Sequence, residues 1–128
     1  MTREEALRYC LTMPGAYLDH PFGPDSDIVK VQGKIFAQLF CLRGAPMLTV
    51  NGDAITNDFY RRLYPGAVTR GYHCPPVQQP YFNTVDLDAD VPDSELTAMI
   101  GRSYRYVVGK LPRRLRAGLD EGSLKETK

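Results

Sequence analysis

The chain contains no tryptophan, and only two histidines and three cysteines among its 128 residues. Cys10, Cys41 and Cys74 lie far apart and form no Cys-x-x-Cys pair. We therefore interpret them as free thiols of a protein in a reducing cytoplasm. A chain of this length buries a hydrophobic core without disulfide or metal crosslinks. The sequence predicts one cytoplasmic domain that needs no such crosslinks.

The chain also lacks an excess of charge of one sign and any long hydrophobic run. Its 16 basic and 15 acidic residues give a formal net charge of +1, whereas dedicated nucleic-acid binders are usually more basic. The N-terminal Met-Thr-Arg-Glu-Glu has no apolar region of the kind found in signal peptides. No apolar run approaches the roughly 20 residues that cross a bilayer. We therefore expect no membrane partner, and the overall charge identifies no other partner.

Catalytic signatures are absent as well. The chain has no Gly-x-Gly-x-x-Gly, P-loop, His-Glu-x-x-His or Gly-x-Ser-x-Gly sequence. His73 and Cys74, together with His20 or Cys41, would offer metal ligands, but no pair has the close spacing of a structural zinc site. We expect no metal, no cofactor and no enzyme activity, and we interpret the chain as a non-catalytic binding protein.

The residues that are present favour a β-hairpin over residues 27–40. Two arms rich in Val, Ile and Phe flank Gln32-Gly33, and a short Gly-containing connection between such arms predicts a tight turn. Strict alternation along the second arm places Ile35, Ala37 and Leu39 on one face, and Phe36 and Phe40 on the other. A strand that is apolar on both faces has to be covered on both. Helices cover one face, so the other is a candidate functional surface.

A helix is predicted before this hairpin. Thr2 and Glu5 have the spacing of a capping box, and Pro14-Gly15 ends the helical pattern. Residues 16–26 are rich in proline and glycine, and we expect them to form a loop.

A third strand and a second helix are predicted after the hairpin. Residues 46–50 resume strand composition, and Asp53 is a suitable N-cap. Ile55, Phe59 and Leu63 are four residues apart and form one apolar stripe on this second helix.

The C-terminal half is predicted to contain a long connection, a strand and a long helix. Residues 64–80 include four prolines and indicate an irregular segment, and residues 81–87 form a strand. Pro92 suits the first turn of the last helix, and Pro112 ends it. Its core-facing stripe comprises Leu96, Ile100, Ser103, Val107 and Leu111. Residues 1–119 are predicted to form the single domain and residues 120–128 a flexible C-terminal tail.

The predicted order is helix, three strands, helix, one or two strands, helix. Antiparallel strands that carry helices on one face indicate an α+β fold, here a two-layer sandwich. Such a sheet leaves its second face to a loop, a partner or a ligand.

A basic cluster lies at the end of the last predicted helix. Its members are Arg102, Arg105, Lys110, Arg113, Arg114 and Arg116, with no acidic residue among them. One interpretation is a surface that contacts the phosphates of nucleic acid. The other is that cations gather at the C-terminus of a helix to complement its dipole, as the acids between Asp86 and Glu95 gather near its start. The sequence leaves both interpretations open.

Ten short segments occur in an order that resembles one family of small bacterial proteins. They are Met13-Pro-Gly15, Pro21-Phe-Gly23, Lys30-Val31, Gly33-Lys34, Phe36-Ala37, Tyr64-Pro-Gly66, Gly71-Tyr-His73, Asn83-Thr-Val85, Ser103-Tyr104 and Leu111-Pro112. Over about residues 2–115 the chain resembles the MmcQ/YjbR family. The resemblance implies a frataxin-like fold and a DNA-binding role in which two hairpin turns form a "double wing".

On this sequence the resemblance places the wings at the turns Gln32-Gly33-Lys34 and Arg43-Gly44. Phosphate contacts are then expected from Lys30, Lys34, Arg43 and Arg70. The chain departs from the family pattern at Asn51, where the family has a lysine, and over residues 74–82, which have lost the family's basic residues. No Lys or Arg occurs between Arg70 and Arg102.

A second hypothesis is a site for a small molecule or a protein partner on the Gly71–His73 loop and the open sheet face. It would use Phe22, Tyr72, His73 and Asn83. The tyrosines around the long connection would close a pocket or stack on bases, or else pack over the edge of the core. Both hypotheses describe a monomer or a homodimer.

Overall fold

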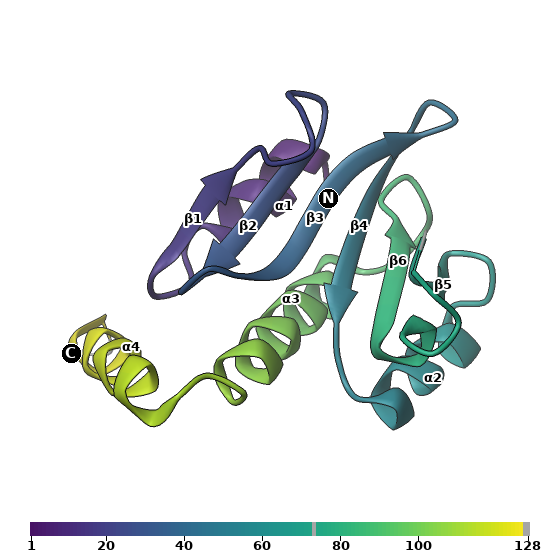
Figure 1. The fold of residues 1–128 in the computed structure, drawn as a ribbon. Coiled ribbons are helices and arrows are strands. Elements are labelled where there is room, and N and C mark those ends of the chain that lie inside the picture. The colour runs from purple at the N-terminus through teal and green to yellow at the C-terminus, as the bar shows by residue number, and fades with distance from the viewer. Residues whose placement is uncertain (73, 127–128) are drawn as a thin grey trace.

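The computed structural model describes the backbone of residues 1–72 and 74–126 and the side chains of these residues up to Leu119 (Figure 1). His73 therefore lies outside the described residues. Residues 127 and 128 and all side chains of the segment 120–128 also lie outside them, and the flexible tail stays a prediction. The elements are α1 (Arg3–Cys10), β1 (Ala16–Asp19), β2 (Asp27–Val31), β3 (Lys34–Leu42), β4 (Ala45–Asn51), α2 (Ala54–Leu63), β5 (Val68–Arg70), the 3-10 turn η1 (Gln79–Tyr81), β6 (Phe82–Asp86), α3 (Asp93–Val108) and α4 (Arg113–Glu126).

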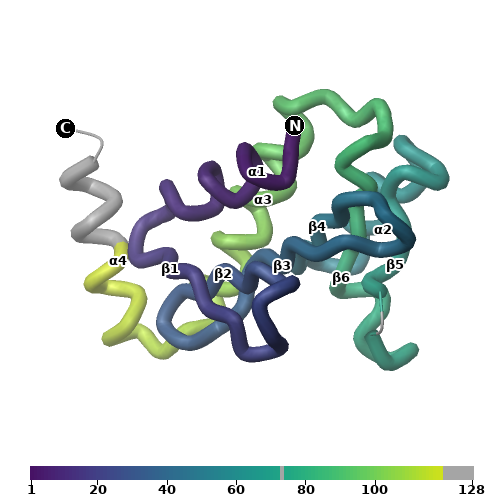
Figure 2. The backbone as a smooth tube through the Cα atoms, turned by 90° about the horizontal axis from the view of Figure 1, so that it is seen from above, coloured from purple at the N-terminus to yellow at the C-terminus, as the bar shows by residue number. Residues whose placement is uncertain are grey.

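The strands of the described chain form one antiparallel sheet in the order β1-β2-β3-β4-β6-β5. Buried Leu39, Leu48, Val85 and Val68 are paired in one row across its centre. This row belongs to the face that the helices cover, and Figure 2 shows α1 and α3 on one side of the sheet. The predicted two-layer α+β architecture is confirmed.

The predicted hairpin at Gln32-Gly33 is confirmed, with Val31 paired to Lys34. Both turn residues have positive φ, 49° at Gln32 and 80° at Gly33. This backbone matches the right-handed twist of the two strands, and glycine adopts it without steric cost. The β3–β4 turn also has two consecutive residues with positive φ, 53° at Arg43 and 80° at Gly44.

A bulge in β3 changes which way its aromatic residues point. The β2–β3 register shifts between Val29 and Lys30, so that Phe36 has no partner on β2. Its ring is buried and meets Tyr104 of α3 edge-on, with centroids 5.3 Å apart. Phe40 instead stacks on Tyr72 at a centroid distance of 5.8 Å. The prediction that Phe36 and Phe40 share a face is therefore wrong, because the bulge breaks the alternation between them.

Ser103 of α3 bonds the backbone that this bulge leaves unpaired. Its hydroxyl donates to the Phe36 carbonyl over 2.5 Å and accepts from the Asn51 amide over 2.8 Å. The side chain is fully buried. One small polar residue in the predicted apolar stripe thus joins α3 to both β3 and β4.

Two short strands occur where the sequence predicts irregular chain. β1 lies within the predicted loop 16–26, and β5 lies within the predicted irregular segment 64–80. Each is an outer strand of the sheet and has several exposed side chains. Pairing with β2 and β6 forms these strands, and their own residues carry too little apolar periodicity to predict it.

Helix α2 presents its apolar stripe outward. The N-cap at Asp53 is confirmed, since its carboxylate accepts from the Thr56 amide over 2.8 Å. Ile55, Phe59 and Leu63 are 85%, 57% and 48% exposed. The helix is held to β6 by polar contacts that are described below. A stripe of this spacing normally faces a core, so the pattern correctly predicts the helix but not its orientation.

The predicted core-facing stripe is buried at all five positions, four of them in α3 and the last, Leu111, in the connection that follows the helix. The helix ends at Val108, and a further helix, α4, begins after Pro112. The Pro112 carbonyl accepts from the amides of Leu115 and Arg116. The prediction that the helix continues to Pro112 is therefore wrong, and this proline instead begins the next helix, as suits a residue without an N–H.

Ser103→Ala is expected to lower the free energy of unfolding by about 1–3 kcal/mol, because it leaves the buried Phe36 carbonyl and Asn51 amide without their partner. Chemical denaturation would measure the loss. Ser94→Ala, at an exposed position of the same helix, is the matched control and should change stability by less than about 0.5 kcal/mol. Equal effects of the two substitutions would contradict the role of Ser103.

The neighbours Phe59 and Tyr60 test the orientation of α2. Tyr60 is 6% exposed, and Tyr60→Ala should destabilise the protein by about 3 kcal/mol, as for other buried aromatic residues. Phe59→Ala should cost below about 1 kcal/mol, since that ring already meets solvent. Thermal unfolding of both variants would decide, and a larger loss from Phe59→Ala would mean that the stripe faces the core.

Candidate nucleic-acid interface

The structure places the two predicted wing turns at opposite ends of the sheet. The turn before Lys34 and the turn at Arg43 are separated by the whole of β3 (Figure 1). A strand of nine residues spans about 30 Å at 3.3 Å per residue. Lys34 and Arg43 therefore do not converge on one surface.

The other two predicted phosphate contacts also lie apart. The Lys30 ammonium is 2.8 Å from the Asp19 carboxylate. This contact raises the pKa of Lys30 and lowers that of Asp19, so the charge of Lys30 is already compensated. Arg70 ends β5, and its charge acts on the nearby Arg61 of α2. The four residues do not form a common site.

Lys34 instead lies beside the C-terminal end of α3. Lys34 and Lys110 line the same cleft, of about 480 Å³, together with Tyr81 and Tyr106. The Lys110 ammonium donates to the Tyr106 hydroxyl over 2.8 Å and lies 4.2 Å from the centroid of that ring. The β2–β3 turn thus brings one cation to the basic cluster that the sequence places on α3.

The remaining cations follow α3 and the start of α4. Arg102 and Arg105 line a cleft of about 270 Å³ between α2 and α3. Arg105 also lines a larger cleft, of about 610 Å³, with Arg113 and Arg116. Shared lining residues, Arg105 and Tyr106, join the three clefts into one surface. We call Lys34, Arg102, Arg105, Lys110, Arg113 and Arg116 the basic face.

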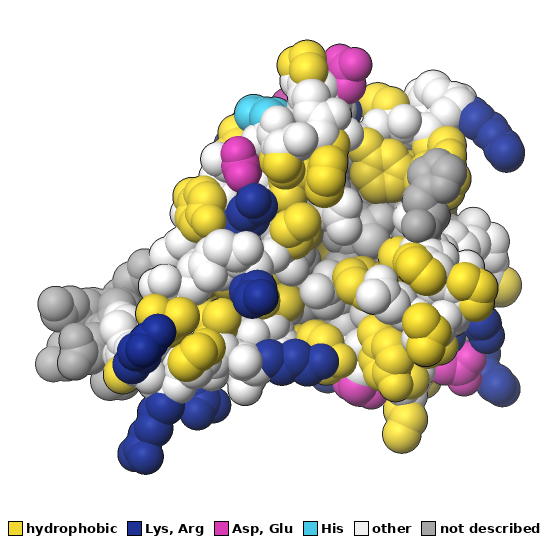
Figure 3. Space-filling view, in the orientation of Figure 1, with side chains coloured by type: hydrophobic (Ala, Val, Ile, Leu, Met, Phe, Trp, Pro, Cys, Tyr) yellow, Lys and Arg dark blue, Asp and Glu magenta, His cyan; other side chains and the backbone are white. Residues whose placement is uncertain are grey.

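One acidic residue, Asp53, lines the cleft that Arg102 and Arg105 share, whereas no described residue that lines the other two clefts is acidic. Residues 96–119 contain no Asp or Glu. None of the ion pairs between described residues involves a member of the face. Figure 3 shows the Lys and Arg side chains gathering near the β2–β3 turn and the α3–α4 connection. The surface is therefore a local concentration of positive charge in an almost neutral protein.

The helix-dipole interpretation explains only part of this cluster. Arg105 lies in the last turn of α3, where a cation complements the negative end of the dipole. Arg113, Arg114 and Arg116 lie in the first turn of α4, which has no acidic residue. A cation at the positive end of a helix costs about 0.3–1 kcal/mol. The three arginines of α4 are therefore not placed for helix stability.

The residues of the predicted ligand site do not converge either. Phe22 lies in the β1–β2 connection and is 68% exposed. Tyr72 stacks on Phe40, and its amide donates to the Thr84 hydroxyl. Asn83 is buried against α2, as its bonds show. Thr84, its neighbour on β6, points to the opposite face of the sheet from Asn83. Tyr72 and Asn83 are therefore on different sides of the sheet.

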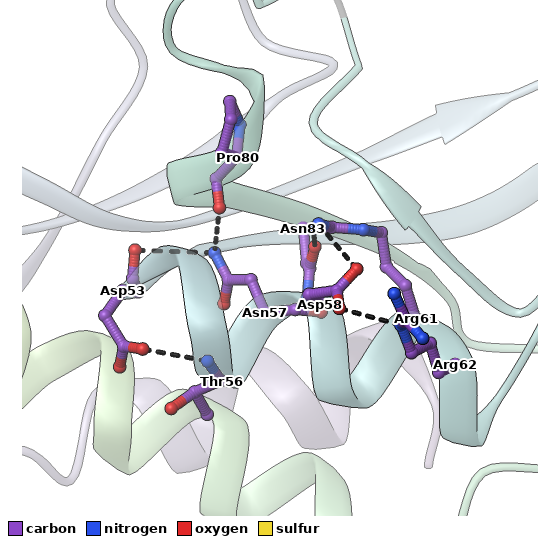
Figure 4. A network of polar contacts seen from close by, with 9 residues as sticks. Asp53, Thr56, Asn57, Asp58, Arg61, Arg62, Pro80 and Asn83 are labelled. Carbon is purple, nitrogen blue, oxygen red and sulfur yellow. Dashed lines mark hydrogen bonds and ion pairs between the residues drawn. The ribbon is translucent and has the colours of Figure 1, made fainter.

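The structure uses Asn83 in a polar network that holds α2 (Figure 4). Its amide donates to the Asn57 carbonyl over 3.1 Å, and its oxygen accepts from Arg61 over 2.6 Å. The Asn57 side chain donates to the carbonyls of Gly52 and Pro80. Burial, and then the charge of Arg70, lower the pKa of Arg61. The signal for this network is an asparagine between the apolar residues of a short strand, and the sequence predicts a ligand contact for it.

The open face of the sheet is polar along its centre. The register aligns Ile28, Gln38, Thr49 and Thr84 across four strands. The hydroxyls of buried Thr49 and Thr84 are 2.8 Å apart. The loop that carries Tyr72 covers Thr84 on this side. This face is therefore partly covered by the chain's own loop.

Comparisons with known proteins give a family and no activity. The family model described as YjbR matches residues 11–106. The chain is 31% identical over 111 residues to "Uncharacterized protein YbdF" of Escherichia coli O157:H7, covering 87% of this chain and 88% of the relative. It is 26% identical over 112 residues to "Uncharacterized protein YjbR" of Escherichia coli K12, covering 88% and 92%.

Two solved structures share the fold. A Deinococcus radiodurans protein with a DUF419 domain superposes with a TM-score of 0.82 at 22% identity, covering 93% of this chain and 88% of that one. A Pseudomonas syringae protein gives a TM-score of 0.70 at 18% identity, covering 83% and 98%. Among the described residues, no helix is both long and apolar enough to span a membrane. On the match over most of its length, the chain belongs to the YjbR family.

Proposed function

We propose that this protein binds the phosphate backbone of nucleic acid through its basic face and catalyses no reaction on it. The observation that carries the proposal is that six cations, none of them in an ion pair between described residues, line joined clefts along α3, the start of α4 and the β2–β3 turn. Lys and Arg that neutralise phosphates release condensed counterions, and this release supplies most of the affinity of non-specific binding.

The dimensions of the basic face suit a nucleic-acid strand. Arg102 and Lys110 are eight positions apart on α3 and its C-terminal end, a rise of about 12 Å. One strand of a duplex presents about three or four phosphates over that length. Exposed Tyr81, beside Lys34 and Lys110, adds an aromatic surface on which an unpaired base can stack.

The proposal differs from a double-wing arrangement in the residues that it assigns. It includes Lys34 but not Arg43, which lies at the other end of β3. It does not use Lys30, whose ammonium is paired with Asp19. The two arrangements therefore predict opposite results for substitution of Arg43.

The affinity for labelled single-stranded and duplex DNA should fall linearly with salt on a log–log plot. For three or four phosphates the slope is expected to be about −2 to −4, at about −0.9 per phosphate contacted in duplex and −0.7 in single strands. Fluorescence anisotropy at several salt concentrations would measure it. Absence of binding to both DNAs at low salt would refute the proposed function.

Lys34→Gln with Lys110→Gln should reduce the salt slope by about 2 and weaken binding at least tenfold at low salt, because two phosphate contacts are lost. Arg43→Gln is the matched control, since it also removes one turn cation, and it should leave affinity and slope unchanged. Loss of binding on Arg43→Gln equal to that of the double variant would favour the double wing over the basic face.

A further inference from the structure

The largest cleft of the basic face lies where α4 meets the end of α3. Its volume of about 610 Å³ falls within the 300–1,000 Å³ of small-ligand sites. Three of its lining side chains are the guanidinium groups of Arg105, Arg113 and Arg116, and none of the lining residues that the structure describes is acidic. Pro14, Tyr104 and Leu119 supply other parts of the wall. Among the described residues, the cleft thus combines three cations with an otherwise uncharged lining.

Buried contacts hold the walls of this cleft in place. The Tyr104 hydroxyl donates to the Pro14 carbonyl over 2.6 Å. Leu119 of α4 is 7% exposed and lies so close to Gly15 that a Cβ there would be 2.6 Å from its Cδ2 atom. Gly15 also has φ of +73°, which favours glycine. The α1–β1 turn therefore packs closely against α4, and the three arginines lie at the edge of the cleft between them.

The three guanidinium groups that line the cleft have the same charge and repel one another. Arg113 and Arg116 begin α4, and the free amides of a helix N-terminus carry further positive charge. Leu111 and Pro112, which precede the helix, have no side-chain oxygen to cap those amides. An anion with several oxygens would accept bonds from the guanidinium groups and relieve the repulsion.

The number of cations points to a phosphate monoester over a phosphate diester. A diester within a strand has one negative charge, whereas a monoester carries about two at neutral pH and has three terminal oxygens. Planar guanidinium groups match such oxygens in pairs. We infer that this cleft binds a phosphate monoester, such as the terminal phosphate of a nucleic-acid strand that lies on the basic face. The strand-end assignment rests on the proposed function.

The test compares two single-stranded oligonucleotides of one sequence, labelled at the 3′ end, with a 5′-phosphate or a 5′-hydroxyl. The wild-type protein should bind the phosphorylated strand about tenfold more tightly at moderate salt, as expected for added charge-assisted bonds. Arg113→Gln with Arg116→Gln should abolish this preference. Arg114→Gln is the matched control, because it removes a cation of the same helix that does not line the cleft, and should keep the preference.

Thermal unfolding of the same proteins in inorganic phosphate, compared with chloride at equal ionic strength, separates the two sources of the group. If neither oligonucleotide binds but phosphate raises the Tm of the wild type and of Arg114→Gln, and not of the double variant, the cleft takes a free phosphate and the proposed function fails. If both oligonucleotides bind equally and phosphate leaves the Tm unchanged, the cleft inference is wrong while nucleic-acid binding stands. A preference that survives in the double variant would also overturn the inference. Without phosphate the double variant should be at least as stable as the wild type, which excludes misfolding as the cause of its loss.

Discussion

The position of α3 depends on one buried hydroxyl. The bulge at Phe36 removes a carbonyl from the β2–β3 ladder, and Ser103 is the group that bonds it while also receiving the Asn51 amide. Buried backbone groups are almost always paired, so the helix has little freedom to slide or rotate over the sheet. Arg102 and Arg105 flank Ser103 on the same helix. Because the Ser103 side chain points into the core, the side chains of these two arginines point toward solvent. The buried bonds of Ser103 thus determine where the positive charges of α3 lie on the surface.

Elements with local chemistry of their own were predictable from the sequence. The capping box of Thr2 and Glu5 is present with both of its bonds, the Gln32-Gly33 turn has the backbone that its residues favour, and the α3 stripe is buried throughout. The strands β1 and β5 were missed because their extended conformation depends on pairing with neighbouring strands of the sheet. Helix α4 was missed because Pro112 was interpreted only as a stop, although a proline is equally suited to the beginning of a helix.

The candidate site was predictable in composition and not in place. The sequence shows that six cations lie from Arg102 to Arg116. Periodicity does not reveal that the cluster is divided between the C-terminal part of one helix and the N-terminus of the next, where the helix dipoles have opposite signs. Nor does it reveal which hairpin turn reaches the cluster, since that depends on the direction of β3 relative to α3. For the same reason Asn83 was assigned to a ligand. A side-chain amide on a strand is equally suited to bond a helix, and here it supplies polar contacts to α2, whose apolar stripe faces solvent.

Substitution of one residue, Gly15, would change how α4 is held and thereby one part of the surface. A larger residue there would have to displace Leu119 and adopt a backbone conformation that side chains disfavour, while its Cβ would be in ordinary contact with Val31 of β2. Substitution at this position would therefore loosen α4 more than it disturbs the sheet. Members of the family that differ at this glycine would be expected to have gained or lost the arginine cleft independently of the fold, so that binding preferences could diverge by small genetic steps on a constant scaffold.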